Sequence, residues 1–250
     1  MDKKKLFKYC FGIECENFPK NVILTPFIPL KRFKKYCDAS GMFSGTMYSG
    51  YFSTVNNDEL AIVHCGIGDR LAGDAILLMG KAEVKNLIFL GTCGGLKEIE
   101  IGDILICDGA ADGEGFSRYY RKDFSFEPLT ARENIIEGDP DYIEEVHRYF
   151  NKHAGKGIVK KGKVFTIGSL LAETQKNISI IKEKGFVGIE MEMSTVYQAA
   201  VVSSISAAGI AIVSDIPEEK PLWEYPYKDK ETGFNESFEK AIRLSVEFFK

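Results

Sequence analysis

Residues 69–95, DRLAGDAILLMGKAEVKNLIFLGTCGG, decide the fold class. Residues 69–83 carry apolar side chains at positions 71, 72, 75, 76, 78, 79 and 82, the spacing of a helix with one buried face. Residues 87–90 form an apolar run typical of a buried strand, and a glycine-rich loop, 91–95, is expected to follow it. A helix that leads into a wholly apolar strand indicates an α/β protein whose sheet is covered on both faces.

The same alternation continues on both sides of this stretch. Residues 21–25 and 209–214 are further apolar strands, whereas 48–55 and 60–65 flank a polar turn and predict a hairpin. Because a hairpin is antiparallel, we expect the central sheet to be mixed. We expect one domain, residues 1–250, with a three-layer α/β/α architecture. The other expected helices span 139–150, 174–184 and 236–249, with one starting near Met191, and the other expected strands span 103–107, 163–167 and 186–189.

Composition excludes several classes of protein. The net charge of -4 gives no basic field for nucleic acid. Six cysteines without a CxxC pair and three histidines without HxxxH argue against a disulfide scaffold and a metal site. The uncharged run 193–214 contains too many polar groups for a membrane span, so we interpret it as a buried helix and a buried strand, broken at Gly209. With no signal peptide recognised at the N-terminus, a cytoplasmic location is expected. We also expect an enzyme that needs no cofactor.

Four expected strand ends carry residues suited to chemistry: 65–68 (CGIG), 91–95 (GTCGG), 190–192 (EME) and 214–215 (SD). Binding sites of open α/β sheets gather at such ends. The CGIG turn lacks the third glycine of a dinucleotide fingerprint, because position 71 is Leu. Its glycines could instead bring backbone N–H groups close to an oxyanion or a hydroxyl, or serve only a tight turn.

The acidic residues at two of these ends each leave two interpretations. Of Glu190 and Glu192, we expect one to point inward and the other outward. An inward carboxylate needs hydrogen-bond donors, which sugar hydroxyls would supply, although acids also favour a helix N-terminus. Asp215 ends an apolar strand, where desolvation raises a carboxyl pKa and suits a general acid. Alternatively, Asp215 only turns the chain before Pro217.

Together, and in this order, these motifs resemble the nucleoside phosphorylase/nucleosidase superfamily over residues 21–215. The most specific parts are GTCGGL (91–96), VGIEMEMSTVYQAA (187–200) and VSD (213–215). The segment DGEGFSRYY (112–120) looks like the loop after the fifth strand in uridine phosphorylase relatives. The resemblance implies cleavage of a nucleoside between its ribose and its base.

Site residues follow from the resemblance. It implies that Asp215 acts at N7 of a purine as the glycosidic bond breaks, and that Glu192 binds the ribose 2′ and 3′ hydroxyls beside Met191 and Ile67. The residues that would surround the base are Cys93, Gly94, Phe165, Thr166 and Glu190.

The phosphate side departs from the family pattern. Where hexameric members have a Gly-Asp-Pro-x-Arg loop, residues 27–31 read FIPLK, so Phe27 and Lys31 replace the glycine and the arginine. Phe89 stands where a second arginine is expected. The remaining phosphate candidates are Thr92, Lys31, Arg32 and Arg70, with Arg118 or a neighbouring subunit as further sources of positive charge.

Three functions therefore stay open. The first is phosphorolysis of a purine nucleoside to free base and ribose 1-phosphate, as in nucleotide salvage. The second is hydrolysis, although residues 25–30 lack the Glu that nucleosidases of this superfamily use to activate water. The third is a noncatalytic nucleoside-binding protein. The resemblance also implies a homo-oligomer, a trimer or hexamer or else a dimer, and the aromatic residues Trp223, Tyr225 and Tyr227 could form an interface or a lid.

Overall fold

A computed structural model describes residues 2–55, 58–224 and 232–250. Within these residues a single sheet forms the centre of the molecule. Its strands are β1 (Asn21–Thr25), β2 (Ala39–Ser44), β3 (Ser49–Val55), β4 (Asp58–His64), β5 (Asn86–Gly95), β6 (Ile104–Gly113), β7 (Ile135–Glu137), β8 (Val159–Ile167), β9 (Gly188–Glu190) and β10 (Ser206–Asp215).

The sheet closes on itself at β5. The strand order is β2-β3-β4-β1-β5-β10-β6-β8-β9, and the last two residues of β5 pair with β9. Strands β1, β4, β5 and β10 run parallel, whereas β6 is antiparallel to β10 and β9 is antiparallel to β5. This confirms the expected mixed sheet, and the pairing of β3 with β4 confirms the predicted hairpin. Closure brings the ends of β5, β9 and β10 together.

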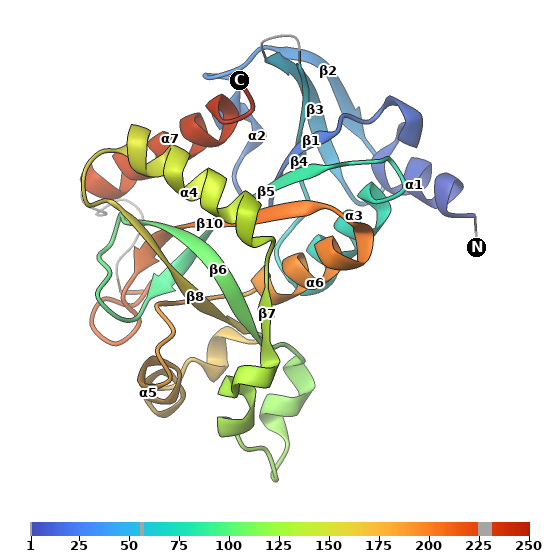
Figure 1. Cartoon of the computed structure of the whole chain (residues 1–250). Coiled ribbons are helices and arrows are strands. Elements are labelled where there is room, and N and C mark those ends of the chain that lie inside the picture. Colours follow the sequence, from blue (N-terminus) through green and yellow to red (C-terminus); the bar gives the residue numbers. More distant parts are fainter. Residues whose placement is uncertain (1, 56–57, 225–231) are drawn as a thin grey trace.

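Helices cover both faces of the sheet (Figure 1). They are α1 (Lys3–Phe11), α2 (Leu30–Phe33), α3 (Asp69–Met79), α4 (Pro140–Ala154), α5 (Gln175–Glu183), α6 (Met193–Ser203) and α7 (Thr232–Glu247). Helices α4 and α7 pack on each other and on β10, while α3 packs on α6, which contacts β6 and β10. The expected three-layer architecture is confirmed. Among the described residues, no helix combines the length and the apolar character needed to cross a bilayer.

The uncharged run 193–214 is a helix and a strand, as expected, but it breaks elsewhere. Helix α6 ends at Ser203, and Ser204 turns the chain with a φ of 55°. Gly209 lies inside β10. A Cβ at that position would be 2.2 Å from Met193 Sδ. The glycine permits close packing of α6 on β10 and does not end an element.

One expected loop is also wrong. Residues 91–95 continue strand β5, where neighbours crowd the glycines: a Cβ on Gly94 would lie 2.7 Å from Pro217 Cγ. Strand β6 is longer than the predicted strand 103–107 and extends to Gly113. Beyond it lie three short 3-10 helices, η2 (Phe116–Tyr120), η3 (Glu127–Thr130) and η4 (Arg132–Asn134), and strand β7. Helix α1 and strand β2 were not predicted.

Candidate active site

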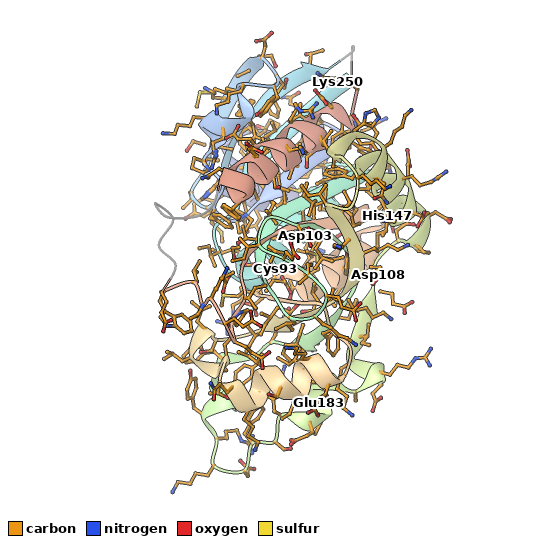
Figure 2. All side chains as sticks on the ribbon, turned by 90° about the vertical axis from the view of Figure 1, so that its left-hand side faces the viewer. Cys93, Asp103, Asp108, His147, Glu183 and Lys250 are labelled. Carbon is orange, nitrogen blue, oxygen red and sulfur yellow. The ribbon has the colours of Figure 1, made fainter. Side chains whose placement is uncertain are left out.

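The register of the sheet brings the predicted base residues together. Gly94 of β5 pairs with Ile189 of β9 on one side and with Asp215 of β10 on the other. Thr166, near the end of β8, pairs with Glu190. Cys93, one residue before Gly94, is buried and is labelled in Figure 2. Three of the four sequence motifs therefore contribute to one region where the closed part of the sheet ends.

Glu192 points back to the CGIG turn. Its side chain is buried, and Oε1 accepts a hydrogen bond of 2.6 Å from the backbone N–H of Gly68. Gly68 has a φ of 113°, which favours glycine, and it starts helix α3. Burial, with a smaller contribution from Asp69, raises the pKa of Glu192 to about 7. The Glu192 side chain makes no capping hydrogen bond to α6 and lies instead at the N-terminus of α3.

The Glu190 carboxylate accepts hydrogen bonds from the residues around it. Its Oε1 accepts from the Thr166 hydroxyl at 2.5 Å, and Oε2 accepts from the N–H groups of Glu192 and Met193 at 2.7 and 2.6 Å. Burial and the nearby Glu192 carboxylate raise the pKa of Glu190 to about 8. Both acids are buried, so the expectation that one points outward is wrong. Glu190 holds the first turn of α6, and thereby the position of Glu192.

Asp215 ends β10 with a buried side chain. The Ser214 hydroxyl oxygen lies 2.6 Å from Asp215 Oδ1 and 3.2 Å from the backbone carbonyl oxygen of Cys93. These contacts hold the carboxyl group beside β5. Burial raises the pKa of the Cys93 thiol far above its usual value, so this side chain is neutral. A carboxyl group and a neutral thiol thus lie next to the end of β9.

The other predicted ligand residues differ in exposure. Phe165 is fully buried and its ring packs 5.2 Å from that of Phe126, within a second apolar cluster. Met191 is half-buried at the edge of this cluster, whereas Ile67 is 62% exposed. Their assignments to base and ribose stay predictions.

The residues predicted to bind phosphate differ in their partners and in their exposure. Arg32 forms an ion pair with Glu239 of α7, with Nη2 2.6 Å from Oε1, and its guanidinium lies 4.5 Å from the centre of the Phe238 ring. Lys31 and Arg70 are exposed. Thr92 is half-buried within β5, opposite Ile212. Arg32 is thus neutralised within the protein, and the phosphate assignments stay predictions.

Glu114 was missed as a site residue. Its Oε1 accepts hydrogen bonds from the Ser194 hydroxyl at 2.6 Å and from the Thr195 hydroxyl, both in the first turn of α6. Burial raises its pKa, and its charge contributes to raising the pKa of Glu192. The sequence carried a signal for this residue, because Glu114 and Ser194 lie inside the motifs quoted for the resemblance.

Glu173 was also missed, and it carried no sequence signal. It follows the 3-10 helix η5 (Leu170–Ala172), before α5. Burial and the Asp215 carboxylate raise its pKa to about 7. Within the described ranges, no group of three or more His, Cys, Asp or Glu side chains could hold a metal ion.

Comparisons with known proteins agree with this geometry. The family model of the phosphorylase superfamily matches residues 29–250. A DeoD-type purine nucleoside phosphorylase of Clostridium novyi is 26% identical over 235 residues, covering 92% of this chain and 87% of its own length. A protein of the same name from Buchnera aphidicola is 26% identical, covering 90% of each chain.

Solved structures share the fold. Uridine phosphorylase of Vibrio fischeri superposes with a TM-score of 0.74 at 16% identity, over 95% of this chain and 92% of its own. Purine nucleoside phosphorylase of Toxoplasma gondii, solved with immucillin-H, gives a TM-score of 0.76 at 16% identity over the same shares. The family model covers most of the sequence, and this chain belongs to the phosphorylase superfamily.

Proposed function

We propose that this protein cleaves the N-glycosidic bond of purine nucleosides by phosphorolysis, releasing free base and ribose 1-phosphate. The observation that carries the proposal is the position of two buried carboxyl groups. Glu192 lies against the N–H of Gly68, while Asp215 lies beside Gly94 at the closed end of the sheet. Relatives named purine nucleoside phosphorylase, about a quarter identical over most of the chain, support it.

The chemistry suits these two groups. As the bond between C1′ and N9 breaks, the ribose gains positive charge and the base gains negative charge. Asp215 gives its proton to N7 and so neutralises the leaving base, a general acid effect of about 10²–10⁴-fold. Glu192 accepts hydrogen bonds from the 2′ and 3′ hydroxyls and fixes the sugar for attack. A phosphate oxygen then forms the new bond to C1′.

The raised pKa of Glu192 fits this role. In the free protein the carboxylate is buried, and burial outweighs the backbone hydrogen bonds from Gly68 and Met191, so its pKa is about 7. Two ribose hydroxyls would donate hydrogen bonds to the ionised Glu192 carboxylate and so lower its pKa. Ribose binding is thus expected to release a proton near neutral pH.

Hydrolysis is the second candidate, because the phosphate side is poor in free cations. Arg32 is paired with Glu239, and Phe27 and Phe89 pack in or against the core. Phosphate needs several donors aimed at one point. We therefore propose a weak phosphate site, completed by Thr92 with Lys31 or Arg70 or by a second subunit. A protein that only binds nucleosides is the third candidate.

Assembly and location belong to the same proposal. We propose a homo-oligomer, a trimer, hexamer or dimer, that acts in cytoplasmic nucleotide salvage. Exposed apolar side chains support association, since Leu171 is 81% and Trp223 67% exposed. Tyr225 and Tyr227, expected to join Trp223 in an interface or lid, lie outside the described residues. Sedimentation at micromolar concentration tests this, and a fully active monomer would contradict it.

The decisive experiment measures products. Adenosine, guanosine, inosine and uridine are incubated with the protein, with and without phosphate, and the base and sugar products are separated by chromatography. We expect purine release that requires phosphate and yields ribose 1-phosphate. Free ribose at saturating phosphate would establish hydrolysis instead. Nucleoside binding without release of base would leave only the binding protein.

A further inference from the structure

Glu114 connects the end of β6 to the first turn of α6. It follows Gly113, the last residue of the strand, and its backbone N–H donates to Asp112 Oδ1 at 3.0 Å. Its Oε1 accepts hydrogen bonds from the Ser194 hydroxyl at 2.6 Å and from the Thr195 hydroxyl. Ser194 is fully buried, so its hydroxyl needs a partner within the protein. A carboxylate carried by β6 therefore satisfies two hydroxyls of α6.

Thr195 is held on both branches of its side chain. Its hydroxyl donates to Glu114, whereas its methyl group, Cγ2, faces α3. A Cβ added to Gly73 of α3 would lie 2.6 Å from that methyl group, so the two helices are in close contact here. A β-branched side chain has few rotamers, and two contacts in different directions leave Thr195 one orientation. Glu114 thus fixes, through Thr195, how α6 lies against α3.

The hydrogen bond between Gly68 and Glu192 spans the same pair of helices. Gly68 precedes α3 and Glu192 precedes α6, and the N–H of the first lies 2.6 Å from Oε1 of the second. Any shift of α6 along α3 would therefore move the Glu192 carboxylate. Glu190 and Thr166 accept from the backbone N–H groups of this turn. Glu114 is the acceptor for its side-chain hydroxyls.

We propose that Glu114 is a positioning residue, which keeps the Glu192 carboxylate where the ribose hydroxyls of the substrate bind. This rests on the proposed function, in which Glu192 accepts from the 2′ and 3′ hydroxyls. Glu114 acts through Ser194, Thr195 and the turn that follows Glu192, and it has no part in binding the base. A displacement of about 1 Å in a binding group can lower turnover by about 10²-fold. Loss of Glu114 should therefore affect ligands that contain ribose and spare the free base.

The test compares ligands with and without ribose. kcat/KM is measured for adenosine and inosine at saturating phosphate, and Kd is measured for adenine and hypoxanthine by calorimetry. In Glu114→Ala, kcat/KM should fall about tenfold, whereas both Kd values should stay within about twofold of the wild type. Glu114→Gln keeps an acceptor oxygen for the two hydroxyls and should recover most of the lost kcat/KM.

A second variant and a control separate positioning from folding. Thr195→Val removes the hydroxyl with little change of shape and should lower kcat/KM about threefold, again without weakening the binding of free base. Glu127→Ala is the matched control. Glu127 Oε2 also accepts from a hydroxyl, that of Ser125 at 2.6 Å, but both residues are exposed in the segment around η3. This variant should behave as wild type in both measurements.

A double variant tests the route through Glu192. In Glu192→Gln protein the group that Glu114 positions is already altered. Adding Glu114→Ala should then lower kcat/KM by less than about twofold more. Independent roles would instead give the full tenfold loss a second time.

Three results would overturn the role of Glu114. They are wild-type kinetics in Glu114→Ala and Thr195→Val, equal losses for nucleosides and free bases, and additive losses in the double variant. If Glu114→Ala does not fold, Thr195→Val decides by the same criteria. Where the wild-type protein cleaves purine nucleosides, such a failure concerns Glu114 alone. If the wild-type protein neither binds nor cleaves them, the proposed function fails and the role of Glu114 fails with it.

Discussion

The base and ribose side of the site and the α2–α7 contact hold their acids in opposite ways. Burial raises the pKa of Glu190 to about 8 and those of Glu192 and Glu173 to about 7. Glu239 of α7 is also partly buried, yet hydrogen bonds from Tyr36, Arg32 and Lys35 outweigh burial and lower its pKa. At Glu190 deep burial outweighs three hydrogen-bond donors, whereas at the more exposed Glu239 three donors, two of them cationic, outweigh burial.

This difference separates a binding region from a structural contact. Groups whose protonation is perturbed by burial gather where ligands bind, because the ligand supplies the missing interactions. The Arg32–Glu239 pair instead anchors α2, which follows β1, to the C-terminal helix. A cation that serves the fold in this way is not free to bind phosphate. A ligand at the ends of β5, β9 and β10 would offset the cost of burying these acids, whereas Arg32 is already paired with Glu239.

Asp215→Asn should produce the largest effect. Without the proton donor at N7, turnover of purine nucleosides is expected to fall by about 10²-fold or more. The Kd for nucleoside should change much less, because asparagine has nearly the same shape. Steady-state kinetics at saturating nucleoside measure the change. The control is Glu183→Gln, which alters an exposed acid at the end of α5. Turnover like that of the wild type would remove Asp215 from the mechanism.

Glu192→Gln tests the ribose contact with a somewhat smaller effect. Loss of hydrogen bonds to a charged group costs about 1.5–3 kcal/mol, so kcat/KM should fall about 10- to 100-fold. A 2′-deoxy substrate should lose a similar amount in the wild-type protein. In the variant the deoxy substrate should lose little more, because the same interaction is already gone. Additive losses would show that the carboxylate and the hydroxyl do not meet.

The stability of the protein should also depend on pH because of these acids. The pKa values of Glu190 and Glu192 are about 8 and 7 in the folded protein, whereas the ordinary pKa of a glutamate side chain is 4.5. Between the ordinary and the raised values the folded state keeps protons that the unfolded state has lost, so the unfolding free energy falls as pH rises. The slope reaches at most about 1.4 kcal/mol per pH unit for each group.

Urea denaturation followed by circular dichroism between pH 5.5 and 8.5 measures this slope. Glu192→Gln should flatten it, whereas Glu239→Gln should not, since the lowered pKa of Glu239 makes its contribution disappear only at acidic pH. A slope that is equal in both variants would contradict the assignment of the raised pKa to Glu192.

The sequence predicted the layers and the mixed sheet because buried strands and amphipathic helices leave clear periodic patterns. It misplaced local boundaries where tertiary packing decides. Residues 91–95 have the composition of a loop, but the close approach of Pro217 to Gly94 makes them part of a strand. Glu173 could not be predicted, because its burial depends on tertiary packing around η5 and not on any local pattern.

The smallest expected effect separates two neighbouring cations. Lys31 is exposed, whereas the guanidinium of Arg32 is held by Glu239 and lies on the Phe238 ring. If Lys31 contributes to a phosphate site, Lys31→Ala should raise a millimolar phosphate KM about fivefold, as expected for one accessible charge. Arg32→Ala should leave that KM within about twofold and lower the unfolding free energy by about 1 kcal/mol.

Phosphate titration at fixed nucleoside and urea denaturation give the two quantities for each variant. If Arg32→Ala raises the phosphate KM more than Lys31→Ala does, Arg32 leaves Glu239 when phosphate binds, and the contrast between the two regions fails.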